Sequence, residues 1–312
     1  MMRFCQFRSL QSCLSLLLML SVAAAIGGRN SLGGEEGLST ASHPVPEAIL
    51  WHTDYGTAVA AAKEQKSFVL LWFVDPGKSD ENEKWEASVL NDPRIRERLA
   101  KIVAVRLPQD AKVPTGEKGE QQTALLEHPA FAELLRQPGV ALLDLRDEAS
   151  PHFHFVVSVY PFGRGPLSSD GLIAMLDLPT GSLTQRTLIW AIRTHGEQPQ
   201  SARGAPNSIL AMETESHARL QADLNLQGHH HWEARFQSIN ARLGEGMVSR
   251  EVCAESWPGQ HLVDAAEECV HSWRQSSGHW EAVSGSHECF GFDMKLGTGG
   301  VWYAVGIFGD RR

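Results

Sequence analysis

Residues 267–309, EECVHSWRQSSGHWEAVSGSHECFGFDMKLGTGGVWYAVGIFG, decide the fold of the C-terminal part of this chain. Apolar residues recur at the spacing of one helix face up to Trp273. The members of this face are Ala265, Ala266, Cys269, Val270 and Trp273. Ser276, Ser277 and Gly278 are expected to end the helix, which leaves His279 at the mouth of a turn.

Two strand patterns follow this turn. Residues 290–294 alternate between apolar and other residues, as a half-buried strand does, and residues 301–308 form a second, aromatic-rich run. A glycine-rich loop, 297–300, separates them. The simplest packing is a hairpin of the two strands behind the helix.

In order and spacing, this region resembles the end of CAP superfamily (SCP/PR-1-like) domains. Bacterial members have a W-x-x-S-x-G-H turn, then a strand with G-x-D, then a Tyr-containing strand that closes in Phe-Gly. The matching residues here are Trp273, Ser276, Gly278, His279, Gly291, Asp293, Tyr303, Phe308 and Gly309. The resemblance implies an α-β-α sandwich over residues 207–312, with a cleft formed by two His and two Glu that binds a divalent metal in some members.

The resemblance also suggests which residues form this cleft. The first His falls in the cluster 229–231, where His229 is preferred and His231 is second. Glu255 is the best match to the first Glu, with Glu251 as the alternative. His279 matches the second His, whereas the second Glu falls at Ser276, so the set is incomplete.

Imidazole and carboxylate groups together suit zinc or another borderline cation. A metal at His229, Glu255 and His279 is therefore one interpretation, and a hydrogen-bonded structural cluster is the other. No P-loop, dinucleotide fingerprint or nucleophile elbow is present in the sequence.

The N-terminal half alternates buried strands with helices, which indicates an α/β domain. The expected strands are 68–74, 102–107, 140–145 and 153–159, and the expected helices are 58–64, 85–90 and 127–135. This layout resembles the thioredoxin fold, with a lead-in at Trp51, Asp54 and Lys63. The two motif cysteines of that family fall at Ser79 and Asn82, and its cis-proline falls near Pro138. Without a thiolate at a helix N-terminus, disulfide exchange is not expected.

Residues 1–27 have the pattern of a secretory signal peptide: basic Arg3 and Arg8, a short apolar core, and a small-residue end. An uncleaved anchor is the alternative, and no stable membrane span is expected after signal removal. The 312 residues then divide into a flexible leader (28–45), a thioredoxin-like domain (46–165), a connector (166–206) with a helix at 182–195, and the CAP-like domain (207–312). The predicted fold class is α/β and α+β, a βαβ-αββ domain followed by an α-β-α sandwich.

The net charge and the cysteine count bear on which partners and which disulfide bonds are expected. A net charge of −9 with no Lys/Arg-rich run disfavours nucleic acid as a partner. Cys253, Cys269 and Cys289 remain after signal removal, and a disulfide within this set or three buried thiols are both open.

The sequence therefore predicts an exported, periplasmic or extracellular protein without redox activity. It is expected to bind an unknown ligand or envelope component at the His/Glu cleft. A metal-dependent hydrolase acting at the same cleft is the alternative.

Overall fold

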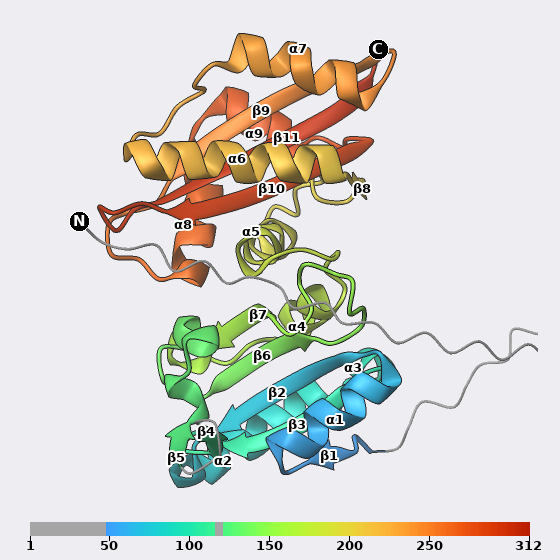
Figure 1. Ribbon diagram of the computed structural model, residues 1–312, viewed down its shortest axis with the longest axis vertical. Helices are drawn as coiled ribbons and strands as arrows, with labels where there is room; N and C mark the ends of the chain where they lie inside the picture. Colours follow the sequence, from blue (N-terminus) through green and yellow to red (C-terminus); the bar gives the residue numbers. More distant parts are fainter. Residues whose placement is uncertain (1–47, 116–120) are drawn as a thin grey trace, which may run out of the picture. The chain divides into compact units, whose positions relative to one another are not determined.

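The computed structural model describes residues 48–115 and 121–312, with two main β-sheets that are each covered by helices on both faces (Figure 1). The predicted signal peptide (1–27) and leader (28–45) lie outside these residues. In the described part of the chain, no helix is long and apolar enough to cross a bilayer. The described residues belong to one compact unit.

The N-terminal sheet has the strand order β1-β3-β2-β6-β7. Its strands are β1 (Trp51–His52), β2 (Phe68–Val74), β3 (Val103–Pro108), β6 (Gly139–Asp144) and β7 (Val156–Pro161). β1, β3 and β2 run parallel, while β6 and β7 are antiparallel to their neighbours. All seven residues of β2 are buried, as its continuous apolar run predicts for a central strand.

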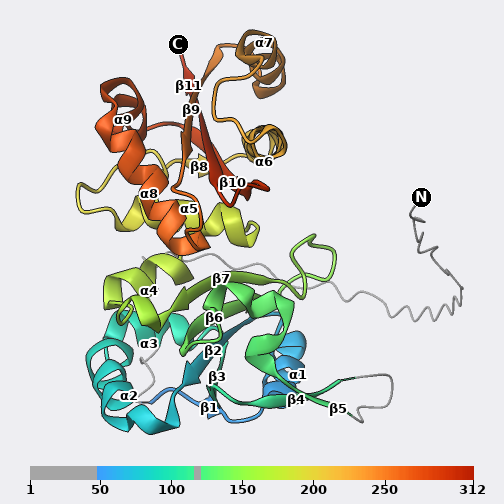
Figure 2. The ribbon, with the colours of Figure 1, turned by 90° about the vertical axis from the view of Figure 1, so that its left-hand side faces the viewer.

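Helices lie on both faces of this sheet, with α1 on one side and α2 and α3 on the other (Figures 1 and 2). The α-helices are α1 (Tyr55–Gln65), α2 (Ser79–Trp85) and α3 (Pro93–Leu99), and shorter turns are η1 (Pro76–Lys78), η2 (Glu86–Leu90), η3 (Leu125–Glu127) and η4 (Pro129–Leu134). Asp54 and Asp92 cap α1 and α3, because their carboxylates accept from backbone N–H groups of the first turn.

Three local predictions need correction in this half. The helix expected at 127–135 is a 3₁₀ turn, and the helix expected at 85–90 is the last residue of α2 followed by a π turn. Pro138 does precede β6, but no cis peptide bond occurs in the described ranges. The sequence patterns also missed the hairpin of β4 (Lys112–Thr115) and β5 (Gln121–Ala124).

The predicted connector contains η5 (Phe162–Arg164), α4 (Ser169–Leu176) and α5 (Leu183–Thr194). Ser182 caps α5 through a capping box with Gln185. The Pro, Ser and Gly residues of 198–207 predict a flexible linker, but the structure holds this segment in place. Ser201 and Ala202 are fully buried, and β8 (Ala205–Pro206) pairs with the second sheet.

The second sheet has the order β8-β10-β11-β9. β9 (Met247–Glu255), β10 (Cys289–Leu296) and β11 (Trp302–Arg311) are antiparallel, and β10 with β11 forms the predicted hairpin. Helices α6 (Ser208–Leu224) and α7 (Trp232–Leu243) cover one face, while α8 (Leu262–Gln275) and α9 (Ser277–Ser284) cover the other (Figure 2). A Cβ at Gly291 would lie 2.4 Å from the Leu210 backbone, so glycine there lets α6 pack close to β10.

The predicted segment 46–165 contains the five-stranded sheet and the β4-β5 hairpin, and segment 207–312 contains β9, β10 and β11 of the second main sheet. Helix α5 contacts both main sheets. Thr184 on α5 donates to Asp293 on β10 at 2.6 Å, and Trp190 packs edge-on against Tyr160 of β7 at 5.5 Å. One core cluster includes buried apolar residues of both sheets, and a second, smaller cluster lies between α6, α7 and the second sheet. The chain is a mixed α/β and α+β protein.

Candidate functional site

The helix end near His279 differs from the prediction. Helix α8 ends at Gln275, and only Ser276 has an extended backbone, with φ −104° and ψ 115°. Ser277 and Gly278 then begin α9, so His279 lies in the first turn of a helix and not at the mouth of a turn. One extended residue is sufficient to redirect the chain, and the rest of the Ser-Ser-Gly run continues as helix.

The structure brings His229 and His279 together, as the sequence predicts. His229 follows α6 in the chain and His279 belongs to α9, and their ring centroids are 5.9 Å apart. The side chain of His229 is 42% exposed, and His279 is half-buried. We refer to these two side chains as the His229–His279 pair. Burial, and to a lesser degree His229, lowers the pKa of His279 below its usual range.

Glu251, the alternative carboxylate, supports this pair. Its side chain is fully buried, and Oε1 accepts a hydrogen bond from His229 Nδ1 at 3.0 Å. Arg235 Nη2 of α7 lies 2.6 Å from the other oxygen, Oε2. Burial alone would raise the pKa of Glu251, but the contacts with His229 and Arg235 lower it, so the carboxylate is ionised.

Glu255, the preferred carboxylate, does not join this group. It shares a strand face with Glu251 and Cys253 because side chains alternate along β9. However, it lies at the exposed end of the strand and forms no hydrogen bond or ion pair with another described side chain. The alternation predicted the right face, but not which carboxylate on that face is buried.

Two side chains of α6 hold the loop that presents His229. His217 Nε2 donates to the Gly228 carbonyl at 2.9 Å, and the Gly228 N–H donates to Gln221 Oε1 at 2.9 Å. His217 and Gln221 are one helical turn apart and buried, so together they hold both polar groups of one residue's backbone. Burial lowers the pKa of His217, which keeps the ring neutral.

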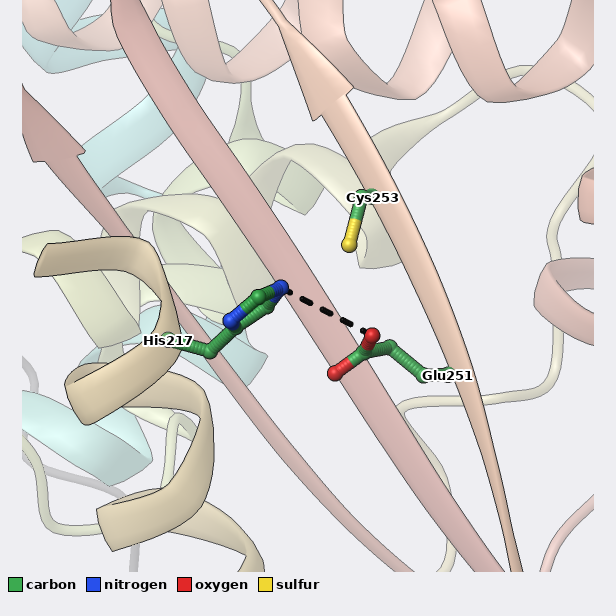
Figure 3. Close-up of side chains that lie close together, drawn as sticks. All are labelled: His217, Glu251 and Cys253. Carbon is green, nitrogen blue, oxygen red and sulfur yellow. Dashed lines mark ion pairs between the residues drawn. The ribbon is translucent and has the colours of Figure 1, made fainter. Parts of the chain in front are cut away.

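A thiol completes the buried part of the site. Ligand atoms of His217, Glu251 and Cys253 all lie within 4.8 Å of one another, and Figure 3 shows the three side chains converging from α6 and β9. Cys253 Sγ is 3.7 Å from His229 Nδ1. Burial, with Glu251 nearby, raises the pKa of the thiol well above 9.0, so Cys253 is protonated.

The two histidines that follow His229 in the chain, His230 and His231, do not join the His229–His279 pair. His230 Nε2 lies 3.1 Å from the Leu226 carbonyl, and its ring is 5.9 Å from that of His217. His231 precedes α7 with φ 56°, is exposed, and has no side-chain hydrogen bond or ring contact within the described ranges. The second choice for the first His is therefore not part of the group.

Sequence reasoning did not identify His217, Arg235 or Cys253 as site residues. A usable signal existed for His217, because it lies one helical turn before Gln221 on α6. For Cys253 the signal was its place on the same strand face as the carboxylates. All three cysteines, Cys253, Cys269 and Cys289, are buried free thiols, so the alternative of a disulfide among them does not hold.

Ser79 and Asn82, where the thioredoxin resemblance expects cysteines, lie apart from the histidines. Ser79 is exposed at the start of α2, and the Asn82 amide donates to the Asp75 carbonyl at 2.9 Å. A hollow of about 640 Å³ adjoins Asn82, Trp85 and Pro138, and it shares no residue with the His229–His279 pair. Neither Ser79 nor Asn82 can exchange a disulfide.

No family model and no curated protein matches this chain. Among solved structures, an outer surface protein from Borrelia burgdorferi is similar over 35% of this chain and 78% of that chain. The sequence identity is 18% and the TM-score is 0.29, a level at which we take nothing about function from the likeness.

Proposed function

We propose that this is an exported, non-redox protein that binds a ligand or envelope partner at the His229–His279 pair of a CAP-like domain. The observation that carries the proposal is the meeting of three segments at one place. The loop after α6 supplies His229, β9 supplies Glu251, and α9 supplies His279. A buried carboxylate fixes one imidazole and leaves the other half-buried beside it, as a preformed recognition site requires.

Layering and strand order support the two family resemblances within this proposal. Helices on both faces of the β8-β10-β11-β9 sheet agree with a CAP-like α-β-α sandwich. The order β1-β3-β2-β6-β7, in which β6 runs opposite to the other four strands, agrees with a thioredoxin-like domain. With Ser79 and Asn82 at the motif positions, that domain would serve as a scaffold or partner surface.

The contacts of Glu251 favour binding over hydrolysis. A general base must reach a water molecule with a free carboxylate oxygen. Here one oxygen accepts from His229 and the other lies against Arg235, and the side chain is fully buried. We therefore propose that Glu251 positions His229, and we place the hydrolase second.

Co-sedimentation with envelope fractions of the producing organism would test this function. We expect the mature wild-type protein to pellet with the fraction, because the preformed pair recognises an envelope component. His229→Ala or His279→Ala should weaken binding by at least about tenfold, as loss of a central contact does. His271→Ala, which changes an exposed histidine on α8, is the matched control and should bind normally.

Two results would contradict the proposal. One is a wild-type protein that stays in the supernatant at every protein concentration. The other is equal pelleting of the His279→Ala and wild-type proteins. Circular dichroism of each variant separates loss of binding from loss of folding.

A further inference from the structure

We propose that His217, His229, Glu251 and Cys253 form a buried binding site for a zinc ion beneath the His229–His279 pair. The four donor atoms are His217 Nε2, His229 Nδ1, Glu251 Oε1 and Cys253 Sγ. This set differs from the metal set expected from the sequence, His229, Glu255 and His279, in its donors and its burial. It also supplies four protein ligands where the surface pair supplies two.

The separations of these atoms suit one tetrahedral ion. Zinc binds nitrogen and oxygen at about 2.0–2.2 Å and sulfur at about 2.3 Å, so neighbouring ligands in a tetrahedron are roughly 3.3–3.8 Å apart. Glu251 Oε1 lies 3.0 Å from His229 Nδ1 and 3.7 Å from His217 Nε2, and His229 Nδ1 lies 3.7 Å from Cys253 Sγ. Cys253 Sγ lies within 4.8 Å of the ligand atoms of both His217 and Glu251. Side-chain shifts of about 1 Å would therefore bring all four donor atoms to bonding distance of one zinc ion.

The donor types select the metal. Two imidazoles, one thiolate and one carboxylate suit zinc, whereas magnesium and calcium require mostly oxygen ligands. The side chains of His217 and Glu251 are fully buried, and Cys253 is 2% exposed. His229, whose side chain is 42% exposed, would close the site toward solvent. Four protein ligands are typical of a structural zinc ion rather than a catalytic one.

Protons and charges can be accounted for at each ligand. The zinc ion replaces the Cys253 thiol proton, which leaves to solvent, and the thiolate offsets one of its two charges. Each imidazole binds through the nitrogen named above, so its proton moves to the other ring nitrogen. At His217, zinc binding therefore replaces the hydrogen bond from Nε2 to the Gly228 carbonyl. Glu251 binds through Oε1, while Oε2 keeps its contact with Arg235 at 2.6 Å. Zinc binding therefore releases a proton and weakens in acid.

The ion would join α6, the loop after α6, and β9 at one point. His217 comes from α6 and Glu251 with Cys253 from β9, so the ion would fix the loop residue His229 against both elements. Its effect on recognition rests on the proposed function, because it concerns how His229 faces His279. Zinc binding itself does not depend on that function, and the two can fail separately.

The test is metal binding by the full mature protein after removal of metal with a chelator. Zinc titration, followed by calorimetry and by elemental analysis after dialysis, should give one zinc ion per chain. Cys253→Ser should lower zinc affinity by at least about 100-fold, because loss of a ligand costs at least as much as loss of a group that only supports one. Cys269→Ser and Cys289→Ser remove the other buried thiols and should retain wild-type affinity.

Cobalt(II) provides a second measurement that identifies the sulfur ligand. The wild-type protein should show a thiolate-to-cobalt charge-transfer band, and Cys253→Ser alone among the three cysteine variants should lose it. Glu251→Gln should weaken zinc binding, whereas Glu255→Gln, at the exposed end of the same strand, should not. Melting temperatures with and without zinc show whether each variant folds, because zinc stabilises only a folded chain that binds it.

Several outcomes would overturn the site. They are no zinc uptake by the wild-type protein, equal zinc affinity in Cys253→Ser, and loss of zinc in His279→Ala with retention in Cys253→Ser. The last result would place the metal on the surface pair. Zinc binding as expected, with unchanged envelope binding by His279→Ala, would preserve this site and reject the proposed function.

Discussion

Asp144 is a buried carboxylate whose charge depends on one neighbour. The side chain is 3% exposed, and Arg146 donates to its two oxygens at 3.0 Å and 2.7 Å. Burial alone would raise the pKa of Asp144, but the hydrogen bonds from Arg146 lower it below 3.8. Because the folded pKa is lowered, this carboxylate stabilises the fold above pH 3.8, and the contribution is lost as pH falls through the folded value.

Asp144→Asn should therefore destabilise the protein in a pH-dependent way. At about pH 7 we expect the free energy of unfolding to fall by about 1.5–3 kcal/mol, the range for a hydrogen bond to a charged group. The difference from wild type should shrink as the pH falls below 3.8, because the wild-type carboxylate then also becomes protonated. Urea unfolding at about pH 7 and at a series of acidic pH values measures this. Asp80→Asn, on an exposed residue, is the control, and a difference for Asp144→Asn that does not change with pH would count against the assignment.

Some residues of the site could be predicted from the sequence, and others could not. His229 and His279 were identified because a family resemblance marks them, and they do meet. Glu251 and Glu255 lie on one strand face, and the sequence favoured Glu255, whereas the structure joins Glu251 to His229. The choice depends on Arg235, which comes from a different helix. His217 was missed because its role is to hold the Gly228 backbone, and this contact requires the loop to fold back on α6.

For segment 198–207, too, the contacts with distant parts of the chain could not be predicted from the sequence. Its Pro, Ser and Gly content correctly indicates an irregular chain, but composition does not reveal whether the backbone groups are hydrogen-bonded. Gln200 and Ser201 donate to carbonyls of α9, and Ala205 and Asn207 donate to carbonyls at the start of β10. By contrast, continuous apolar runs such as β2 were predicted well, since burial on both faces leaves a direct trace in sequence.

This segment should resist proteolysis. Trypsin could cleave after Arg203, whose side chain is exposed, but cleavage requires the backbone to open first. Arg193 holds the neighbouring Ala202 carbonyl at 3.1 Å and 2.9 Å, so Arg193→Ala should speed cleavage there. Mass spectrometry of timed digests measures the rate of cleavage after Arg203. Arg219→Ala, on the exposed face of α6, is the control and should be cleaved there at the wild-type rate. Rapid release of two halves from the wild-type protein would contradict this expectation.

On the scale of the whole molecule, polar contacts connect the two sheets in addition to their shared core. Arg164 after β7 contacts Asp264 and Glu267 of α8 at 2.5 Å each. The Glu133 carboxylate accepts from the backbone N–H of Leu262, the first residue of α8, at 3.1 Å. Since the apolar core is also continuous, the two halves should not unfold independently.

We therefore expect one cooperative unfolding transition. Hydrogen exchange in increasing denaturant, followed by mass spectrometry, should show peptides of β2 and β11 losing protection at the same midpoint.

Thr184→Val removes a donor to the buried Asp293 and should lower that shared midpoint, because the free energy of unfolding falls by about 1–3 kcal/mol. Arg164→Ala should act in the same direction by about 1 kcal/mol, since its partners are partly exposed. Arg94→Ala, which breaks exposed pairs with Asp92 and Asp170 at the surface, should leave the midpoint almost unchanged. If β11 peptides exchanged first while β2 remained protected, the second sheet would be a separate folding unit, and the contacts of α5 would not couple the halves.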